Sequence, residues 1–289
     1  MLSSMPTAEQ VLREAIRTFR ASPNIDHPNA DKDELDAEDI LSFVLGREPD
    51  PRDEIDGAVL HRYRRLVRRR ESGEPAAYIT GRTTFLGLQL EVRRGSFIPR
   101  DSSEFMAEQA IRRLRRRRRP VHVDLATGVG PVALAVASRV REAQVFGVDL
   151  FARPVALARR NAERLRLRNA QFLRGDLFDP LPRRLAGGID VVTIHPPYVG
   201  RREVRTLPHE ILSFEPLESL TDRSPLGLGL LSRVAYEGPR WLRPGGWLLV
   251  EVSPDRSREV RAVLRQAGFR DIRSTKGPIP VSRVIVGRT

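Results

Sequence analysis

The sequence predicts an α/β protein in which a small helical N-terminal domain precedes a Rossmann-like, doubly wound sheet with a C-terminal antiparallel hairpin. Three observations support this fold class. From residue 121 onward, short apolar runs alternate with helical stretches, as they do in βαβ units. Roughly the first seventy residues show apolar positions at helical spacing instead. Residues 269–287 contain two strand-like runs joined by a Gly/Pro turn.

The helical domain is predicted to span residues 1–75. Thr7 is a candidate N-cap for a first helix, whose apolar positions fall between residues 11 and 19. A second helix is predicted from Leu35 to Leu45, before Gly46, and a third from Ile55 to Val67. These residues contribute nothing to the motifs described below, so we expect this domain to recruit the substrate.

Residues 76–101 are predicted to form a β-hairpin linker, because their apolar positions alternate and Gly87 and Gly95 mark turns. The sheet domain follows from residue 102 to residue 289. Its first helix is predicted to carry a block of arginines and to end at Pro120. This block could bind RNA or an acidic partner, but we favour its interpretation as the solvated C-terminal end of a helix, where cations complement the helix dipole. The block contains Arg112, Arg113 and Arg115 to Arg119.

Composition excludes several function classes. The chain has 289 residues and no Cys, which excludes disulfides and thiolate metal ligands. No stretch approaches the roughly 18 consecutive apolar residues of a membrane span. The N-terminus also lacks a basic segment followed by an apolar one, so we expect a cytoplasmic protein without a membrane partner. No metal site is expected, because no metal-ligand spacing relates His27, His61, His122 and His209.

The chain is strongly basic, with 50 Lys and Arg against 37 Asp and Glu residues and a formal net charge of +13. Such a charge can indicate a nucleic-acid partner. Nearly all the cations are Arg, however, which is a bias that a GC-rich genome produces by itself. We therefore interpret the charge as a general attraction for anions and expect nucleic acid to be involved only indirectly, if at all.

A glycine loop joins the first predicted strand to the next helix, and the second strand ends in Asp149. In a doubly wound sheet, ligands bind at the carboxyl ends of strands near the point where strand order reverses. Gly128 and Gly130 allow the backbone to approach a cofactor, and Asp149 can accept hydrogen bonds from ribose hydroxyls. The loop lacks the third glycine of a dinucleotide fingerprint and has Pro131 instead, which argues against a dinucleotide.

Two further strand ends carry candidate site residues. The third strand ends near Asp176 and Leu177, where an acid and an apolar side chain suit an adenine. The fourth ends in His195, Pro196, Pro197 and Tyr198. Consecutive prolines fix the backbone, so His195 and Tyr198 are expected to be held over the cofactor site.

Together these motifs resemble the HemK/PrmC family, whose members methylate the glutamine amide of peptide-chain release factors. The matching segments are DLATGVG at 124–130, Asp149, the run RRNAERLRLRNAQFLRGDLF, HPPY at 195–198, the upstream GEPAAYITGRTTFLGLQLEV and FIPRDSSE, and the downstream FEPLESLTDRSPLGLGLLSRV and LRPGGWLLVEV. The resemblance covers most of the chain. It implies a class I methyltransferase fold.

The resemblance also implies a cofactor and a set of site residues. S-adenosylmethionine would bind the loop formed by Ala126, Thr127, Gly128, Val129 and Gly130, with Asp149 on the ribose and Leu177 beside the adenine. His195 to Tyr198 would form the substrate clamp. The predicted cofactor contacts therefore also include Asp176 and His195, and the predicted catalytic residues are His195, Pro196 and Tyr198.

This chain departs from the family pattern at the substrate clamp. The family has Asn where this chain has His195, and that Asn carbonyl, with a proline carbonyl, accepts the two amide hydrogens of the substrate glutamine. Imidazole offers one acceptor nitrogen when neutral and none when protonated, but it can act as a general base. Ala126 replaces the first glycine of the loop, and VGP at 129–131 replaces a run of small residues. The family's late motif is reduced to Glu251.

Three hypotheses follow from this departure. The first is an S-adenosylmethionine-dependent enzyme that methylates the glutamine of a release factor. The second is a relative that uses His195 as a general base toward an oxygen or nitrogen of another, small-molecule acceptor. The third is a relative without turnover that binds S-adenosylmethionine or nucleic acid. The acceptor atom and the oligomeric state do not follow from the sequence.

Overall fold

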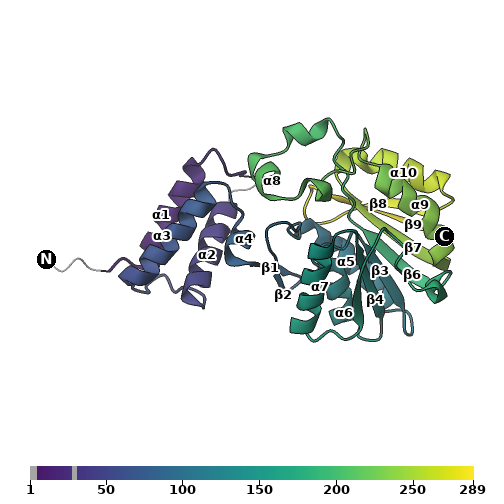
Figure 1. Cartoon of the computed structure of the whole chain (residues 1–289), viewed down its shortest axis with the longest axis horizontal. Coiled ribbons are helices and arrows are strands. Elements are labelled where there is room, and N and C mark those ends of the chain that lie inside the picture. The colour runs from purple at the N-terminus through teal and green to yellow at the C-terminus, as the bar shows by residue number, and fades with distance from the viewer. Residues whose placement is uncertain (1–4, 28–30) are drawn as a thin grey trace. The chain divides into compact units, whose positions relative to one another are not determined.

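The chain folds into two units, each of which is assembled from two separate parts of the sequence (Figure 1). In the computed structural model, which describes residues 5–27 and 31–289, unit 1 contains Met1–Arg82 and Thr206–Glu215. Unit 2 contains Thr83–Arg205 and Pro216–Thr289. The chain therefore leaves unit 2 at Thr206 and returns to it at Pro216. No sequence pattern indicated this excursion, because the segment is shorter than the window over which periodicity is measured.

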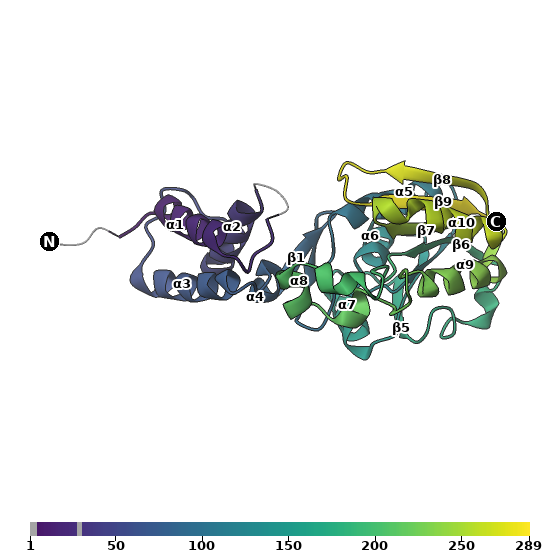
Figure 2. The same cartoon turned by 90° about the horizontal axis from the view of Figure 1, so that it is seen from above.

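Unit 2 is built on a seven-stranded sheet in the order β5-β4-β3-β6-β7-β9-β8. The strands β5, β4, β3, β6 and β7 are parallel, whereas β9 pairs antiparallel with β7 and β8 at one edge (Figure 2). The predicted doubly wound sheet and C-terminal hairpin are confirmed. The strands are β3 (Val121–Leu125), β4 (Gln144–Asp149), β5 (Ala170–Arg174), β6 (Ile189–Ile194), β7 (Leu242–Val252), β8 (Arg270–Lys276) and β9 (Arg283–Arg288).

Helices cover both faces of this sheet, because successive strand residues point to opposite sides. Val191 packs in the layer of α5, α6 and α7, while its neighbour Val192 packs in the layer of α9 and α10. Buried apolar residues on both faces anchor the strand ends that form the site. The helices are α5 (Ser102–Leu114), α6 (Pro131–Arg139), α7 (Ala152–Arg164), α9 (Gly229–Trp241) and α10 (Ser257–Gln266), with short 3-10 helices η1 (Arg183–Leu185), η2 (Glu203–Thr206), η3 (Leu217–Ser219) and η4 (Pro254–Arg256).

Two local predictions were wrong. The segment that follows residue 75 begins with a helix, α4 (Ala76–Thr80), and only then forms the hairpin of β1 (Arg82–Phe85) and β2 (Leu88–Glu91). Four of the five residues of α4 are buried, namely Ala76, Tyr78, Ile79 and Thr80. This tertiary packing overrides the alternating pattern that predicted a strand. The helix α5 ends at Leu114, so Arg115 to Arg119 lie beyond it and are exposed. Leu114 is the last core contact, and adjacent like charges disfavour a longer helix.

Unit 1 contains the three predicted helices, α1 (Ala8–Ala21), α2 (Lys32–Leu45) and α3 (Gly57–Glu71), together with α4 and α8 (His209–Phe214). Thr7 caps α1 as predicted, because its hydroxyl accepts from the Gln10 N–H and the Gln10 side chain accepts from the Thr7 N–H. Gly46 ends α2 in the left-handed conformation. The apolar faces of these helices form their own core, although Leu35 lies outside it at 59% exposure.

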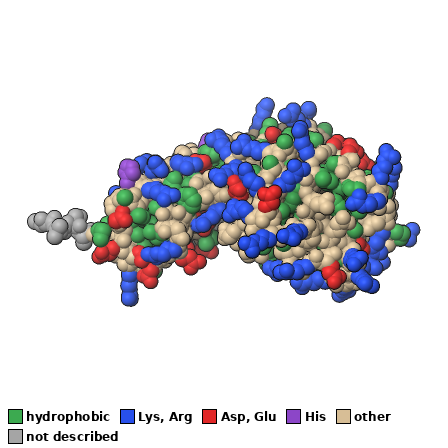
Figure 3. Space-filling view, turned by 60° about the horizontal axis from the view of Figure 1, so that its bottom comes forward, with side chains coloured by type: hydrophobic (Ala, Val, Ile, Leu, Met, Phe, Trp, Pro, Cys, Tyr) green, Lys and Arg blue, Asp and Glu red, His purple; other side chains and the backbone are tan. Residues whose placement is uncertain are grey.

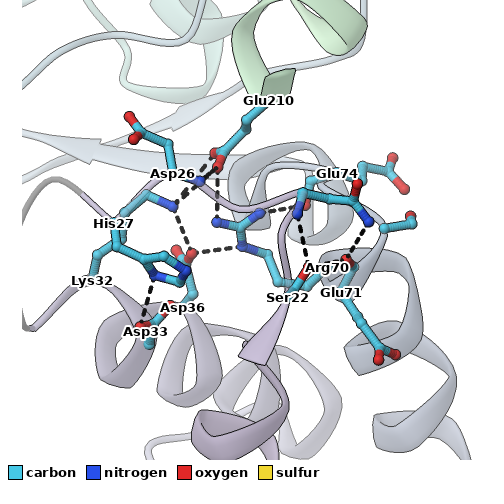
Figure 4. Close-up of polar contacts among 12 residues, drawn as sticks. Ser22, Asp26, His27, Lys32, Asp33, Asp36, Arg70, Glu71, Glu74 and Glu210 are labelled. Carbon is cyan, nitrogen blue, oxygen red and sulfur yellow. Dashed lines mark hydrogen bonds and ion pairs between the residues drawn. The ribbon is translucent and has the colours of Figure 1, made fainter. Parts of the chain in front are cut away.

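A fully buried arginine joins the two sequence parts of unit 1 (Figure 4). Arg70 donates from Nε to Asp36 Oδ2 at 2.7 Å and from Nη2 to Glu210 Oε2 at 3.1 Å. Lys32 Nζ lies 3.0 Å from Asp36 Oδ2 and 3.4 Å from Glu210 Oε1. Two carboxylates therefore neutralise two cations, and Glu210 binds α8 to the helices of residues 1–82.

We expect Glu210→Ala to destabilise unit 1 by about 3 kcal/mol, because removing one partner leaves the Arg70 guanidinium buried with incomplete compensation. Amide hydrogen exchange measured in α3 should then be roughly 100-fold faster. The control is Glu38→Ala, which removes an exposed carboxylate from α2. Unchanged protection in Glu210→Ala would contradict the assigned role of this ion cluster.

Candidate functional site

The candidate site lies at the carboxyl ends of adjacent parallel strands in unit 2. β3 pairs with β4 on one side and with β6 on the other, so the order of connection reverses at β3. Leu125 pairs with Ile194 at the last register position of β3 and β6. The glycine loop and the His195 segment follow these two residues directly, so they emerge side by side.

The glycine loop depends on left-handed backbone conformations at three positions. Ala126, Gly128 and Gly130 have φ of 51°, 57° and 86°. A Cβ added at Gly130 would lie 2.9 Å from the Phe172 ring, whereas one added at Gly128 would meet nothing within 4 Å. Packing thus requires glycine at 130, while the open side of Gly128 leaves room for a ligand. Ala126 adopts the same conformation at a cost, which explains the glycine that the family pattern has there.

Asp149 holds the glycine loop from the end of β4. Its Oδ2 accepts from the Gly128 N–H at 2.9 Å, and its Oδ1 accepts from the Phe151 N–H at 3.0 Å. Burial raises the pKa of this carboxyl, and the backbone hydrogen bonds oppose that shift. Each oxygen keeps further acceptor capacity, so the side chain can also receive hydroxyl donors.

A second acid, Asp124, lies at the centre of a buried network that sequence reasoning did not single out as a site. Its Oδ2 accepts from Thr127 Oγ1 at 2.6 Å and its Oδ1 accepts from Thr193 Oγ1 at 2.7 Å. Burial raises the pKa of Asp124 to about 6. The sequence feature that could have identified Asp124 is its position at the start of the DLATGVG segment.

His122 completes this network. Its Nε2 lies 2.9 Å from Thr193 Oγ1. Since the Thr193 hydroxyl donates to Asp124, the imidazole must donate to Thr193. Burial lowers the pKa of His122 to about 3, so the ring is neutral and serves the structure of the sheet.

Asp176 and Leu177 follow β5. Asp176 forms a bidentate ion pair with Arg233 of α9, at 2.8 and 3.2 Å. Leu177 is buried and has φ of 46°. The ion pair fixes Asp176, and an adenine amine would use the lone pairs that Arg233 leaves.

The His195 to Tyr198 segment is held by the chain near residues 220–222. Tyr198 forms an isolated β-bridge with Thr221, and the Asp222 N–H donates to the Pro197 carbonyl at 3.2 Å. The rings of His195 and Tyr198 are nearly parallel, with an interplanar angle of 15° and centroids 5.6 Å apart. Burial raises the pKa of Tyr198 to about 12, with a further contribution from Glu251, so its hydroxyl stays protonated.

The imidazole of His195 also faces a buried acid. Its Nδ1 lies 3.2 Å from Ser103 Oγ and 3.7 Å from Glu251 Oε2. Glu251 is 1% exposed at the end of β7, and its Oε1 accepts from Ser102 Oγ at 2.8 Å. Ser102, Ser103 and Glu251 were not predicted as site residues. Only the position of Glu251 in the late motif hinted at a role.

The predicted site residues thus form three groups at neighbouring strand ends. Ala126 to Gly130 and Asp149 are connected by hydrogen bonds, and His195 to Tyr198 are connected to the loop through Thr193, Asp124 and Thr127. Asp176 and Leu177 follow β5, which pairs with β4. Within the described residues, no cluster of three or more His, Asp and Glu side chains is suited to a metal ion. No described helix has the length and apolar character needed to cross a membrane.

Comparison with known proteins places this chain in a family. The PrmC N-terminal domain matches residues 10–81, and a methyltransferase domain matches residues 120–263. The release factor glutamine methyltransferase of Bordetella pertussis is 35% identical over 258 residues, which cover 88% of this chain and 94% of that protein. The Vibrio cholerae protein of the same name is 34% identical over 278 residues, or 93% of this chain and 94% of that protein.

The chain belongs to the release factor glutamine methyltransferase family. It is therefore an S-adenosylmethionine-dependent methyltransferase, as the sequence motifs predicted. A solved structure of a 16S rRNA methyltransferase from T. thermophilus is similar in fold, with a TM-score of 0.53 at 19% identity. The similarity covers 72% of this chain and 49% of that one.

The steric requirement at Gly130 of this methyltransferase gives a prediction. Gly130→Ala should destabilise unit 2 more than Gly268→Ala does, by about 1–3 kcal/mol, the usual scale for overpacking. Gly268 is a matched control because its φ of 88° equals that of Gly130 closely, while an added Cβ there would meet nothing within 4 Å. Chemical denaturation followed by tryptophan fluorescence measures both. Equal losses of unfolding free energy in Gly130→Ala and Gly268→Ala would show that backbone strain alone, and not the Phe172 contact, requires glycine at 130.

Proposed function

We propose that this enzyme transfers a methyl group from S-adenosylmethionine to the side-chain amide nitrogen of a glutamine in a peptide-chain release factor. The supporting observation is that the glycine loop and the His195 to Tyr198 segment emerge from paired ends of β3 and β6 and share the Asp124 network. A cofactor on the loop and an amide in the clamp would meet at this edge. The relatives named above, which match nearly the whole chain, are release factor glutamine methyltransferases.

In this proposal the cofactor lies along the ends of β3, β4 and β5. The backbone of Ala126 to Gly130 approaches the methionine part, and the remaining lone pairs of Asp149 accept from the ribose hydroxyls. Leu177 contacts the adenine, and Asp176 receives its amine. The open space beside Gly128 agrees with a ligand at that position.

The chemistry assigned to this site is an in-line displacement. The glutamine nitrogen forms a bond to the methyl carbon while the bond from that carbon to sulfur breaks, and the electron pair of that bond remains on sulfur. Positioning of the two reactants supplies most of the rate enhancement in such a reaction. The rigid Pro196-Pro197 backbone and the stacked rings of His195 and Tyr198 suit that role.

His195 takes over one of the two acceptor positions in this proposal. One amide hydrogen would be accepted by a ring nitrogen of His195 and the other by the Pro196 carbonyl. A neutral imidazole supplies one hydrogen-bond acceptor nitrogen. The Asn of the family pattern likewise contributes one acceptor, its side-chain carbonyl oxygen. A small-molecule acceptor is the alternative substrate, and the experiment below distinguishes the two.

We propose further roles for the segments outside the site. Residues 1–75 would recruit the release factor, and residues 76–101 would link them to the catalytic domain of residues 102–289. The enzyme would act in the cytoplasm, because a chain without Cys needs no oxidising environment for disulfide formation. Lys and Arg side chains are spread over the visible surfaces (Figure 3), which favours a general attraction for acidic partners. We propose no direct role for nucleic acid.

The substrate proposal predicts that the purified enzyme methylates an intact release factor on the glutamine of its Gly-Gly-Gln segment. Mass spectrometry after incubation with labelled S-adenosylmethionine locates the methyl group. The control is a release factor with Glu in place of that Gln, which should stay unmodified because it lacks the amide. Label that appears only in small metabolites of a cell lysate would favour the alternative acceptor.

The cofactor proposal predicts that Asp149→Asn weakens binding of S-adenosylmethionine roughly 5- to 150-fold, which corresponds to about 1–3 kcal/mol for a charge-assisted hydrogen bond. Isothermal calorimetry gives the Kd of each variant. Asp179→Asn makes the same change of charge at an exposed position near β5 and should leave the Kd unchanged. An unaltered Kd in Asp149→Asn would remove Asp149 from the binding site.

A further inference from the structure

We propose that Glu251 is a positioning residue that keeps the proton of neutral His195 on Nδ1, so that Nε2 faces the substrate and receives the proton lost by the methylated amide. This inference rests on the proposed glutamine methylation for the identity of the acceptor. The orientation of the imidazole can be tested without any substrate.

The unsatisfied carboxylate oxygen of Glu251 is the first observation. Among the described residues, Glu251 Oε2 is buried and has no hydrogen-bond partner, whereas Oε1 accepts from Ser102. Buried polar atoms in native proteins almost always find a partner. Nδ1 of His195 lies 3.7 Å from Glu251 Oε2, and a small movement of either side chain brings this pair into hydrogen-bond range.

The charge of Glu251 selects the tautomer of His195. A carboxylate repels the lone pair of an unprotonated Nδ1 and attracts an Nδ1–H, so the Nδ1–H tautomer is favoured. Ser103 Oγ, 3.2 Å from the same nitrogen, accepts from Nδ1–H in this tautomer and would donate to Nδ1 in the other. The Nε2 lone pair is then the only acceptor that the ring can offer to a substrate.

The orientation of the ring is fixed by its neighbours. Tyr198 stacks on one face, and Phe97 meets the ring nearly edge-on, with an interplanar angle of 85° and centroids 5.7 Å apart. The His195 side chain keeps 19% exposure, which leaves one side open. With Nδ1 directed toward Glu251 and Ser103, the opposite edge of the ring carries Nε2.

The pairing of His195 with Glu251 gives His195 a chemical role that the Asn of the family pattern cannot have. As the amide nitrogen bonds to the methyl carbon, the carbon–sulfur bond breaks and its electron pair makes the sulfur neutral. The nitrogen then carries an excess proton, which passes to Nε2 of His195. Glu251 balances the charge of the imidazolium, and the proton leaves to solvent through the exposed side of the ring. An asparagine could accept the hydrogen bond but not the proton.

The tautomer is measured by ¹⁵N NMR of the imidazole nitrogens in the full-length protein. The His195→Asn spectrum identifies the His195 signals by their absence. We expect the wild type to show the Nδ1–H tautomer, and Glu251→Gln to shift His195 toward the Nε2–H tautomer, because the glutamine amide can donate to Nδ1. An Nε2–H tautomer in the wild type would overturn the proposal, and so would a spectrum that Glu251→Gln leaves unchanged.

A double-mutant cycle then tests the consequence for turnover. Glu251→Gln should lower kcat for release factor methylation at least about tenfold, with little change in KM for S-adenosylmethionine. In the His195→Asn background the same change should alter kcat less than about twofold, because no imidazole remains to be oriented. Glu142→Gln, an exposed carboxylate before β4, is the control and should leave kcat unchanged.

The NMR measurement and the double-mutant cycle separate this inference from the proposed function. Equal losses of kcat in both backgrounds would mean that Glu251 acts only on the fold, and the positioning role would be rejected. A wild-type enzyme that leaves release factor unmethylated would count against the proposed substrate, while the NMR result would still decide whether Glu251 sets the tautomer of His195.

Discussion

The buried carboxylate of Asp124 is the interaction on which the site depends. It receives one hydroxyl from the glycine loop, through Thr127, and one from β6, through Thr193. Thr193 precedes His195 by two residues, so the same carboxylate fixes the start of both the loop and the clamp. Burial of this acid is costly, which its raised pKa reflects, and the two hydroxyl donors offset that cost. The loop and the clamp are therefore held as one rigid arrangement, as a reaction governed by positioning requires.

His195 lies beside Glu251 because β6 and β7 are parallel and in register. Ile194 pairs with Val250, so His195 and Glu251 follow at neighbouring strand ends. A parallel pair brings such residues close regardless of their distance in the sequence. The carboxylate next to His195 thus lies in strand β7, and the serines that line the pair come from the start of α5. Three segments distant in sequence create the environment of one imidazole.

Unit 1 is discontinuous in the sequence. The chain that leaves the His195 to Tyr198 segment enters unit 1 at Thr206, where Glu210 binds the buried Arg70, and returns at Pro216. Loss of the Glu210 contact would leave the buried guanidinium of Arg70 with Asp36 as its remaining carboxylate partner, which is unfavourable. The chain therefore crosses between the two units at three points, near residues 82, 206 and 216.

The sequence alone determined the layers of the fold and most of the cofactor loop. Periodicity distinguishes helices from strands, and the order of strands with glycine and acid residues at their ends predicts a ligand edge in any doubly wound sheet. Tertiary structure decided what depends on contacts between distant segments. It made α4 a helix, ended α5 at Leu114, buried Arg70 against Glu210 and placed Glu251 beside His195. Local patterns carry no information on such pairs, because burial and charge compensation are set by residues that the fold, and not the sequence order, brings together.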